Sequence, residues 1–325
     1  MKFGKSLALG TALLLASLST QTIAADFTLK LGSVLSPTDP LQIAAEGFKK
    51  SVEEKSGGRI EVQLFPSSQL GDTQDMMDQA AAGANVGTFV EASRVSVFVP
   101  EFNVLVAPYA FSDVSELAEF VESDTFASWN EKLKEKSGLT LLSFNWYQGA
   151  RHMLTKKPIA KPADLNGVRV RTIGQPLWVE TINAMGAVAT PLPWAEVYPS
   201  LQTGVIDGAE AQPSAIWGAK LYEVIKNVTL TKHIFLMSGM LVSDDWLKSL
   251  PADLQTIVTE ESKRWGASAL KSNVDGAEKI FNDIRATGVE VTAIDIAPFR
   301  DAVKPVWDKL ELTDLVAEVQ KTLGN

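Results

Sequence analysis

The residue with the clearest potential for ligand chemistry is Arg171, which ends the segment Val168-Arg169-Val170-Arg171. Valine and arginine alternate there, so a β-strand would place the valines on one face and the arginines on the other. Ligands of open α/β sheets bind beyond the carboxyl ends of the strands. The planar guanidinium can hold a carboxylate through two parallel hydrogen bonds. We therefore predict an anion clamp at Arg171; the alternative is a solvated arginine on an exposed strand face.

A second arginine, Arg151, lies in a polar and aromatic cluster that runs from Trp146 to His152. Clefts for small ligands combine aromatic walls with a few polar groups. Arg151 and Trp146 are therefore candidate ligand contacts. The alternative is a domain junction packed by Trp146, with Arg151 in solvent.

Glu91 and Arg94 follow the apolar segment 86–90, where another strand is expected to end. Their spacing of three residues lets the two side chains meet on one helical turn. We interpret them as polar groups that, like Arg171, lie beyond the carboxyl end of a strand. The alternative is a surface ion pair, which contributes at most about 1 kcal/mol.

Catalytic motifs are missing from this sequence, which has no GxSxG, HExxH, P-loop or GxGxxG pattern. With no cysteine and only His152 and His233, it also lacks the usual ligands of a zinc or iron–sulfur site. We therefore expect no metal, no cofactor and no enzymatic activity. One alternative stays open, an exported glycosidase that uses Asp207 and Glu210 as its carboxylate pair.

Composition and charge further limit the class of protein that this chain can be. The chain has 325 residues, which predicts about two domains, since a domain usually spans roughly 100–200 residues. Hydrophobic residues make up 46% and charged residues 21% of the chain, as in ordinary globular proteins. Acidic residues outnumber basic ones by 39 to 30. This balance argues against nucleic acid as a partner, because a broad basic surface is missing.

The N-terminus has the layout of a secretory signal peptide. Lys2 and Lys5 precede the mainly apolar segment 7–18, and Thr22 and Ala24 supply small residues at the −3 and −1 positions. The apolar segment is shorter than the roughly 20 residues of a membrane span. We predict cleavage after Ala24 and export of residues 25–325 to the periplasm.

Periodic patterns place the candidate residues on two α/β units. In the first unit we expect strands at 28–32, 59–65 and 86–90, with helices at 40–55 and 72–83, which is the order of a parallel, doubly wound sheet. In the second unit we expect strands at 167–171 and 205–209, with helices at 178–185 and 194–203.

Residues 252–286 carry apolar side chains at helical spacing. At 1.5 Å per residue this helix would be about 52 Å long and would lie under both units. The alternative is two helices broken at Gly266 or Gly276. Since no flexible linker separates the units, we expect the chain to cross between them more than once. We assign residues 25–148 plus 237–276 to domain I and residues 149–236 plus 277–325 to domain II.

These residues lie within an ordered series of motifs that resembles the periplasmic substrate-binding proteins of TRAP transporters, the DctP-like family. The resemblance covers residues 27–310. It rests on Leu31-Gly32, Gly57-Gly58-Arg59-Ile60, Phe65-Pro66, Gln69-Leu70-Gly71, Pro100-Glu101, Pro108-Tyr109, Asp164-Leu165-Asn166-Gly167-Val168-Arg169-Val170-Arg171, Gly186-Ala187, Pro191, Glu196-Val197-Tyr198, Leu201-Gln202-Thr203-Gly204 and Asp207-Gly208-Ala209-Glu210.

The resemblance implies two doubly wound α/β domains joined by hinge segments, a long helix across both, and a ligand cleft between them, as in type II periplasmic binding proteins. It implies a receptor that delivers a small organic anion to a sodium-driven membrane permease. We expect this receptor to be a monomer. Arg171 matches the principal carboxylate-binding arginine of the family, and Arg151 matches a second, supporting arginine. Trp194 matches an aromatic residue that lines the pocket.

Glu91 and Arg94 resemble polar contacts of the sialic-acid-binding branch, but three positions depart from the family patterns. Ala211 stands where the family often has an asparagine, and Gln212 is the candidate replacement. Val34 and Thr73 stand where the sialic-acid branch has an asparagine and an acidic residue. The pattern therefore points away from sialic acid and toward another organic acid with hydroxyl groups, such as a sugar acid.

Overall fold

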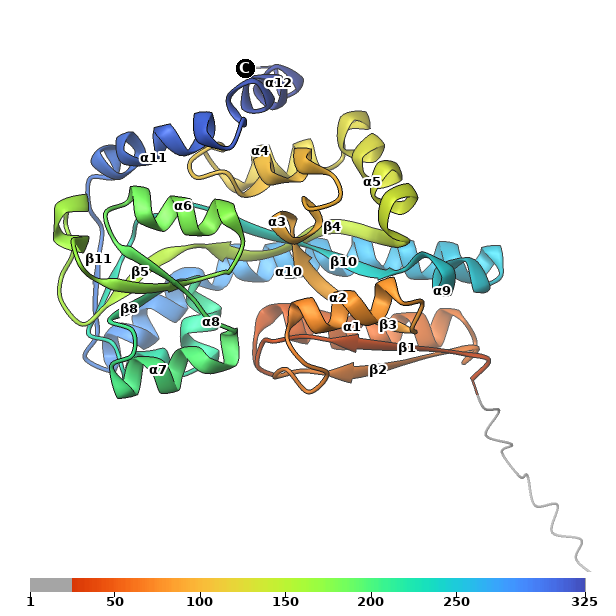
Figure 1. Cartoon of the computed structure of the whole chain (residues 1–325). Helices are drawn as coiled ribbons and strands as arrows, with labels where there is room; N and C mark the ends of the chain where they lie inside the picture. The colour runs from red at the N-terminus through yellow and green to blue at the C-terminus, as the bar shows by residue number, and fades with distance from the viewer. Residues whose placement is uncertain (1–24, 325) are drawn as a thin grey trace, which may run out of the picture.

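The computed structural model describes residues 25–324. The predicted signal peptide, residues 1–24, lies outside these described residues. The chain forms two α/β units, each built on its own sheet (Figure 1). This arrangement confirms the predicted α/β fold class.

The first unit contains a five-stranded sheet in the order β2-β1-β3-β10-β4. Its parallel part has the predicted βαβαβ order, formed by β1 (Phe27–Gly32), α1 (Pro40–Lys55), β2 (Ile60–Phe65), α2 (Thr73–Ala81) and β3 (Val86–Glu91). The sheet is completed by β4 (Leu139–Ala150) and β10 (Phe235–Ser243).

The sheet is mixed, which differs from the parallel sheet predicted for this unit. Strand β10 is antiparallel to both β3 and β4. The reason is topological: β10 returns from the second unit and starts at the cleft, with Phe235 paired to Ala150. In contrast, β1, β2 and β3 end at the cleft, so β10 runs in the opposite direction to them.

The second unit contains a six-stranded sheet in the order β11-β9-β5-β8-β6-β7. Its strands are β5 (His152–Thr155), β6 (Arg169–Thr172), β7 (Val188–Pro191), β8 (Gly208–Ala211), β9 (Asn227–Thr229) and β11 (Glu290–Thr292). Its helices include α6 (Pro176–Ala184), α7 (Val197–Thr203) and α8 (Pro213–Gly218). The predicted strand at 205–209 starts three residues late, because Gly204 ends α7 in a left-handed conformation and Asp207 still lies in the turn.

Three chain segments connect the sheets: two short crossings, and the long helix α10 (Ala252–Ala286), which follows β10 of the first sheet and precedes β11 of the second. Strand β4 ends at Ala150 and β5 begins at His152, so Arg151 alone separates the two sheets at the first crossing. The second crossing covers residues 230–234, between β9 and β10. Gly149, just before the first crossing, has φ of +131°, a conformation that favours glycine.

Helix α10 (Ala252–Ala286) is continuous and runs behind both units in Figure 1, which confirms the predicted long helix. The alternative break at Gly266 is absent for a packing reason. A Cβ at Gly266 would lie 2.0 Å from Oδ1 of Asn145, so glycine lets α10 approach β4 closely. The Asn145 side chain in turn donates a hydrogen bond to the Lys263 carbonyl, 2.8 Å away.

Further helices cover the first unit and the C-terminal end. They are α3 (Ala92–Val95), the 3₁₀ segment η1 (Pro100–Val106), α4 (Val114–Phe120), α5 (Asp124–Ser137), α9 (Asp244–Ser249), α11 (Ala297–Lys309) and α12 (Thr313–Thr322). Helix α11 packs on α6, whereas α12 contacts η1. The C-terminal segment thus touches both units. Among residues 25–324, no helix combines the length and the apolar character that a membrane span needs.

Candidate ligand-binding cleft

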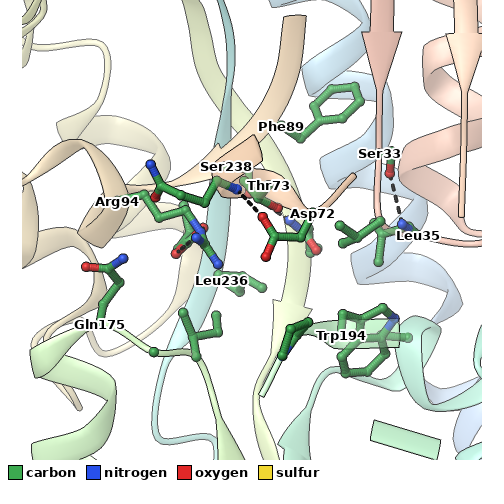
Figure 2. A pocket seen from close by; sticks show the side chains of 18 of the residues that line it. Ser33, Leu35, Asp72, Thr73, Phe89, Arg94, Gln175, Trp194, Leu236 and Ser238 are labelled. Carbon is green, nitrogen blue, oxygen red and sulfur yellow. Dashed lines mark hydrogen bonds and ion pairs between the residues drawn. The ribbon is translucent and has the colours of Figure 1, made fainter. Parts of the chain in front are cut away.

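A cavity of about 330 Å³ lies between the two units and is lined by residues of both. In Figure 2, Asp72, Phe89 and Arg94 approach it from the first unit, and Gln175 and Trp194 from the second. Six of the seven predicted site residues line it: Glu91, Arg94, Arg151, Arg171, Trp194 and Gln212. Its volume falls at the lower end of the range of about 300–1,000 Å³ that is usual for small-molecule sites.

Arg171 is fixed at the carboxyl end of β6 and is 4% exposed. Its Nε donates a hydrogen bond to the Leu192 carbonyl at 2.9 Å. The guanidinium carbon lies 5.3 Å from the centroid of the Trp194 ring. Among the described residues, nothing accepts a hydrogen bond from either Nη atom of Arg171. The side chain therefore offers an unused pair of donor groups in the cavity.

The charge environment of Arg171 follows from its burial. Loss of water lowers the pKa of Arg171 to about 10; the carboxylates of Glu210 and Glu91 oppose this change, and Arg151 and Arg94 add to it. Arg171 is therefore still a cation at neutral pH. The solvated arginine of this strand is Arg169, whose side chain is 45% exposed and pairs with Asp207 at 2.8 Å.

Arg151 is 3% exposed and is held by the second unit. Its Nε pairs with the Glu210 carboxylate, its Nη1 donates to Gln212 Oε1 at 2.7 Å, and its Nη2 donates to the Glu210 carbonyl at 2.6 Å. The guanidinium carbon also lies 5.1 Å from the centroid of the Trp178 ring. Arg151 is thus not the solvated residue of the alternative interpretation.

Glu210 provides the counter-charge for Arg151 at the bottom of the site. Its burial acts to raise the carboxyl pKa, but the charge and the hydrogen bond of Arg151 outweigh that effect; His233, whose Nε2 lies 3.7 Å from Oε2, acts in the same direction as Arg151, and the pKa is lowered to about 2. Thr172 Oγ1 donates to Glu210 Oε1 at 3.2 Å. The carboxylate is therefore ionised and fully engaged at neutral pH.

Glu91 and Arg94 lie on the turn where β3 passes into α3. Arg94 Nε is 3.0 and 3.1 Å from the two Glu91 carboxylate oxygens. The Ser93 hydroxyl donates to Glu91 Oε1 at 3.3 Å. Glu91 is 7% exposed and both residues line the cavity, so this is not the surface ion pair of the alternative.

Gln212 connects the second unit to the first. Its Oε1 accepts from Arg151, and its Nε2 donates to Gln148 Oε1 at 2.9 Å. Gln148 Nε2 then donates to Ser238 Oγ at 2.6 Å. The amide of Gln212 therefore fixes Arg151 and a chain of polar groups along the cavity wall.

Trp146 is the predicted site residue that the structure does not bring to the cavity. It is 0% exposed, its ring centroid lies 4.8 Å from that of Phe89, and its Nε1 donates to Ser143 Oγ at 3.1 Å. Trp146 does belong to β4, the strand that leads to the cleft, but side chains alternate along that strand and the Trp146 side chain points into the core. Phe89 takes the aromatic position at the cavity instead.

Sequence reasoning missed several polar residues of the first unit, above all Asp72. Its Oδ1 accepts from the backbone N–H groups of Gln74 and Asp75 at 2.7 and 3.0 Å and so caps α2. The residue also lines the cavity. The Asp72-x-x-Asp75 capping pattern marks a helix start after a strand. This pattern was the signal in the sequence that could have pointed to Asp72. The other missed polar residues are Ser33, Thr73, Gln74, Gln148 and Ser238 of the first unit and Gln175 of the second.

The balance of charges singles out one cation. Arg151 pairs with Glu210 and Arg94 pairs with Glu91. Among the described residues, Arg171 has no carboxylate within ion-pair distance. The site is therefore electrostatically suited to a ligand that brings one negative charge to Arg171.

The carboxylate pair of the glycosidase alternative is not assembled. Asp207 binds Arg169, and its side chain is 40% exposed at the end of the second unit. Glu210 is buried beneath Arg151, and neither acid lines the cavity. The two carboxylates do not face each other across the cleft as glycoside hydrolysis requires.

Known proteins of the same kind resemble this chain over nearly its whole length. The 2,3-diketo-L-gulonate-binding periplasmic protein YiaO of Escherichia coli (strain K12) is 30% identical over 317 residues, which is 94% of this chain and 96% of YiaO. An apo open TRAP periplasmic solute-binding protein of Escherichia fergusonii is 45% identical, with a TM-score of 0.80 over 91% of this chain and 99% of that one.

A ligand-bound relative superposes more closely despite its lower identity. The TRAP periplasmic solute-binding protein of Actinobacillus succinogenes 130z with bound L-galactonate is 31% identical, with a TM-score of 0.87 over 91% of this chain and 99% of that one.

The family model for bacterial extracellular solute-binding proteins, family 7 (DctP), matches residues 31–314. Together with the fold, the cleft and the two relatives found in TRAP systems, this match shows that the chain belongs to the DctP family of TRAP-transporter periplasmic solute-binding proteins.

Proposed function

We propose that this protein is the periplasmic solute receptor of a tripartite TRAP transporter and binds a sugar acid between its two units. The observation that carries the proposal is the buried guanidinium of Arg171, whose two Nη groups meet the cavity without an acceptor among the described residues. A carboxylate placed there would accept two parallel hydrogen bonds and neutralise the cation.

The rest of the cavity favours a ligand with hydroxyl groups. Asp72, Glu91 and Gln148 bring oxygen acceptors to the lining, and Ser33 and Gln175 bring groups that can donate or accept. Phe89, Trp194 and Leu236 provide apolar walls for a carbon chain. The ligands named for YiaO and for the A. succinogenes protein, 2,3-diketo-L-gulonate and L-galactonate, are hydroxylated acids of this class.

In this proposal the protein acts as a receptor and not as an enzyme. The two units, assigned as residues 25–148 plus 237–276 and 149–236 plus 277–325, rotate about the two short crossing segments and close on the solute. The loaded receptor, a monomer in the periplasm, then delivers the solute to a sodium-driven permease. The covered cleft strengthens each charged contact because water is excluded.

The test is a thermal-shift screen of the purified mature protein, followed by calorimetric titration. The screen pairs each sugar acid with its neutral sugar, for example L-galactonate with L-galactose, and adds simple monocarboxylates, dicarboxylates and sugar phosphates. A ligand at 100 times its Kd stabilises the protein by about 2.7 kcal/mol. We expect at least one hydroxylated monocarboxylate to bind with a Kd below about 10 μM, equivalent to about −7 kcal/mol, and its neutral partner to be silent. A screen in which only neutral sugars or cations raise Tm would overturn the proposal.

A further inference from the structure

Trp178 makes a hydrogen bond between the two units. It lies in the first turn of α6 in the second unit and is 0% exposed. Its indole Nε1 donates to Ser93 Oγ at 2.9 Å, and Ser93 belongs to α3 of the first unit. Trp178 is not among the residues that line the cavity.

The bond connects two groups of cavity residues. A serine hydroxyl has one hydrogen to donate, and the Ser93 hydroxyl donates it to Glu91 Oε1 at 3.3 Å. Glu91 in turn accepts from Arg94. On the other side, the Trp178 ring lies 5.1 Å from the guanidinium carbon of Arg151. One buried tryptophan therefore contacts a cavity-lining cation of the second unit and supports the Glu91–Arg94 pair of the first.

We propose that Trp178 is a positioning residue, which stabilises the closed cleft through Ser93 and keeps Glu91, Arg94 and Arg151 in the positions that receive the solute. This inference rests on the proposed receptor function and adds to it a device that holds the cleft closed. The bond is made in the same arrangement of the units that forms the cavity between them. Rotation that opens the cleft moves α6 away from α3 and breaks it.

The kinetic consequence separates this role from a general structural one. A bond made only on closure does not change the encounter with the open receptor, so it acts on the dissociation rate. The indole N–H has no second acceptor among the described residues. Loss of a buried hydrogen bond of this kind corresponds to about 3- to 10-fold in an equilibrium constant.

The test compares Trp178→Phe, Ser93→Ala and their double variant with wild type by stopped-flow binding of L-galactonate or of the best acid from the screen. Trp246→Phe is the matched control, because Trp246 is also buried and its Nε1 donates to the Thr28 carbonyl at 3.1 Å, within the first unit. We expect Trp178→Phe to raise the dissociation rate about 3- to 10-fold, with the association rate within twofold of wild type. It should have no additional effect in the Ser93→Ala background. Unchanged dissociation, additive effects of the two substitutions, or an equal effect of Trp246→Phe would overturn the inference.

A second measurement does not depend on a solute. The chain has no cysteine, so Lys50→Cys and Val188→Cys would carry the only spin labels, one on each unit. Both native side chains are exposed. Trp178→Phe should shift the ligand-free distance distribution toward longer, open distances. If no acid binds wild type, the proposed function fails while this measurement still tests the inference, and an unchanged distribution would overturn it.

Discussion

The guanidinium carbon of Arg171 lies 5.3 Å from the ring centroid of Trp194, and its Nε is anchored on the Leu192 carbonyl. The ring supports one face of the cation, while the hydrogen bond at Nε fixes the rotation of the fork. Both Nη groups are left without an acceptor among the described residues. The donor pair is therefore held in place before a solute arrives, which reduces the entropy lost on binding.

Arg171 should be the dominant contributor to affinity. Replacement by alanine strands a buried carboxylate of the solute, a loss of about 3–5 kcal/mol, or roughly 10²- to 10⁴-fold in Kd. Arg171→Lys keeps the charge but not the fork, so it should recover only part of the affinity. Arg169→Ala on the same strand is the control, because Arg169 pairs with Asp207 outside the cavity. Calorimetric titration of the folded variants measures each Kd. If the Kd of Arg171→Ala lies within about threefold of wild type, Arg171 is not the carboxylate clamp.

Glu91→Gln should weaken hydroxylated acids more than simple ones. Glutamine keeps the shape of the side chain but loses one charged acceptor. Leaving a solute hydroxyl unpaired costs about 1–3 kcal/mol of binding free energy. The measurement is the ratio of Kd values for a sugar acid and an unhydroxylated monocarboxylate. Equal losses for both acids would mean that Glu91 acts through Arg94, to which it is hydrogen-bonded.

Arg151→Ala should lower stability at neutral pH and cost less affinity than Arg171→Ala. The Glu210 pKa of about 2 lies below its usual 4.5. The native pair therefore adds stability above pH 4.5, which is lost as pH falls from 4.5 toward 2. Without Arg151, burial is the largest effect left on Glu210, and its pKa rises. Urea unfolding between pH 3 and 7 should show a deficit of about 3–5 kcal/mol at pH 7 that shrinks on acidification.

A compensating substitution provides the control for that experiment. The double variant Arg151→Met with Glu210→Gln removes both charges, so it should regain most of the stability at pH 7. A constant deficit across the whole pH range, in either variant, would contradict the assigned role of the Arg151–Glu210 pair.

Trp194→Phe should remove most of the fluorescence change on ligand binding. Trp194 lines the cavity, whereas Trp146 is fully buried beside Phe89. Closure over a solute alters the surroundings of Trp194 most directly. Trp217→Phe is the control, because Trp217 is 37% exposed and stacks on Tyr222 away from the main cavity. A full signal in Trp194→Phe would show that another tryptophan reports binding.

Asp39→Asn should stabilise the protein above pH 6. Burial raises the pKa of Asp39 from 3.8 to about 6, although the Leu41 N–H and the Ser214 hydroxyl act in the opposite direction. The folded state therefore holds this proton more tightly than the unfolded chain. Its contribution to stability is full below pH 3.8 and falls as pH rises toward 6, by up to about 3 kcal/mol. Asparagine keeps the cap on Leu41 and removes that loss.

Urea unfolding of Asp39→Asn between pH 4 and 8 measures the difference. Asp113→Asn is the matched cap variant, because Asp113 caps α4 while exposed and hydrogen bonds from Ser115 lower its pKa. Its substitution should have the opposite sign and slightly reduce stability above pH 4. The same pH profile in both variants would mean that burial of Asp39 is not the cause.

Local sequence patterns determined the elements of this protein and the strand end on which the clamp is built. Alternation predicted β1 and β2, and a short apolar run predicted β3, each to within one residue at either end. Pro40, Ser56 and Gly204 marked helix ends that the structure has. Alternation along Val168-Arg169-Val170-Arg171 also predicted an arginine at the carboxyl end of a strand. These features depend on neighbours along the chain, so periodicity and capping suffice to predict them.

Tertiary structure alone decided which side chains share the cavity. Alternation along the strand predicts the same face for Arg169 and Arg171. In the structure, Arg169 is solvated and pairs with Asp207. Arg171 is buried against Leu192 and Trp194. Trp146 was turned into the core, and Asp72 was brought to the cleft from a different unit. The same holds for β10, whose antiparallel place follows from its return across the cleft. Each outcome depends on packing and charge contacts between residues far apart in the chain, and such contacts leave no local pattern.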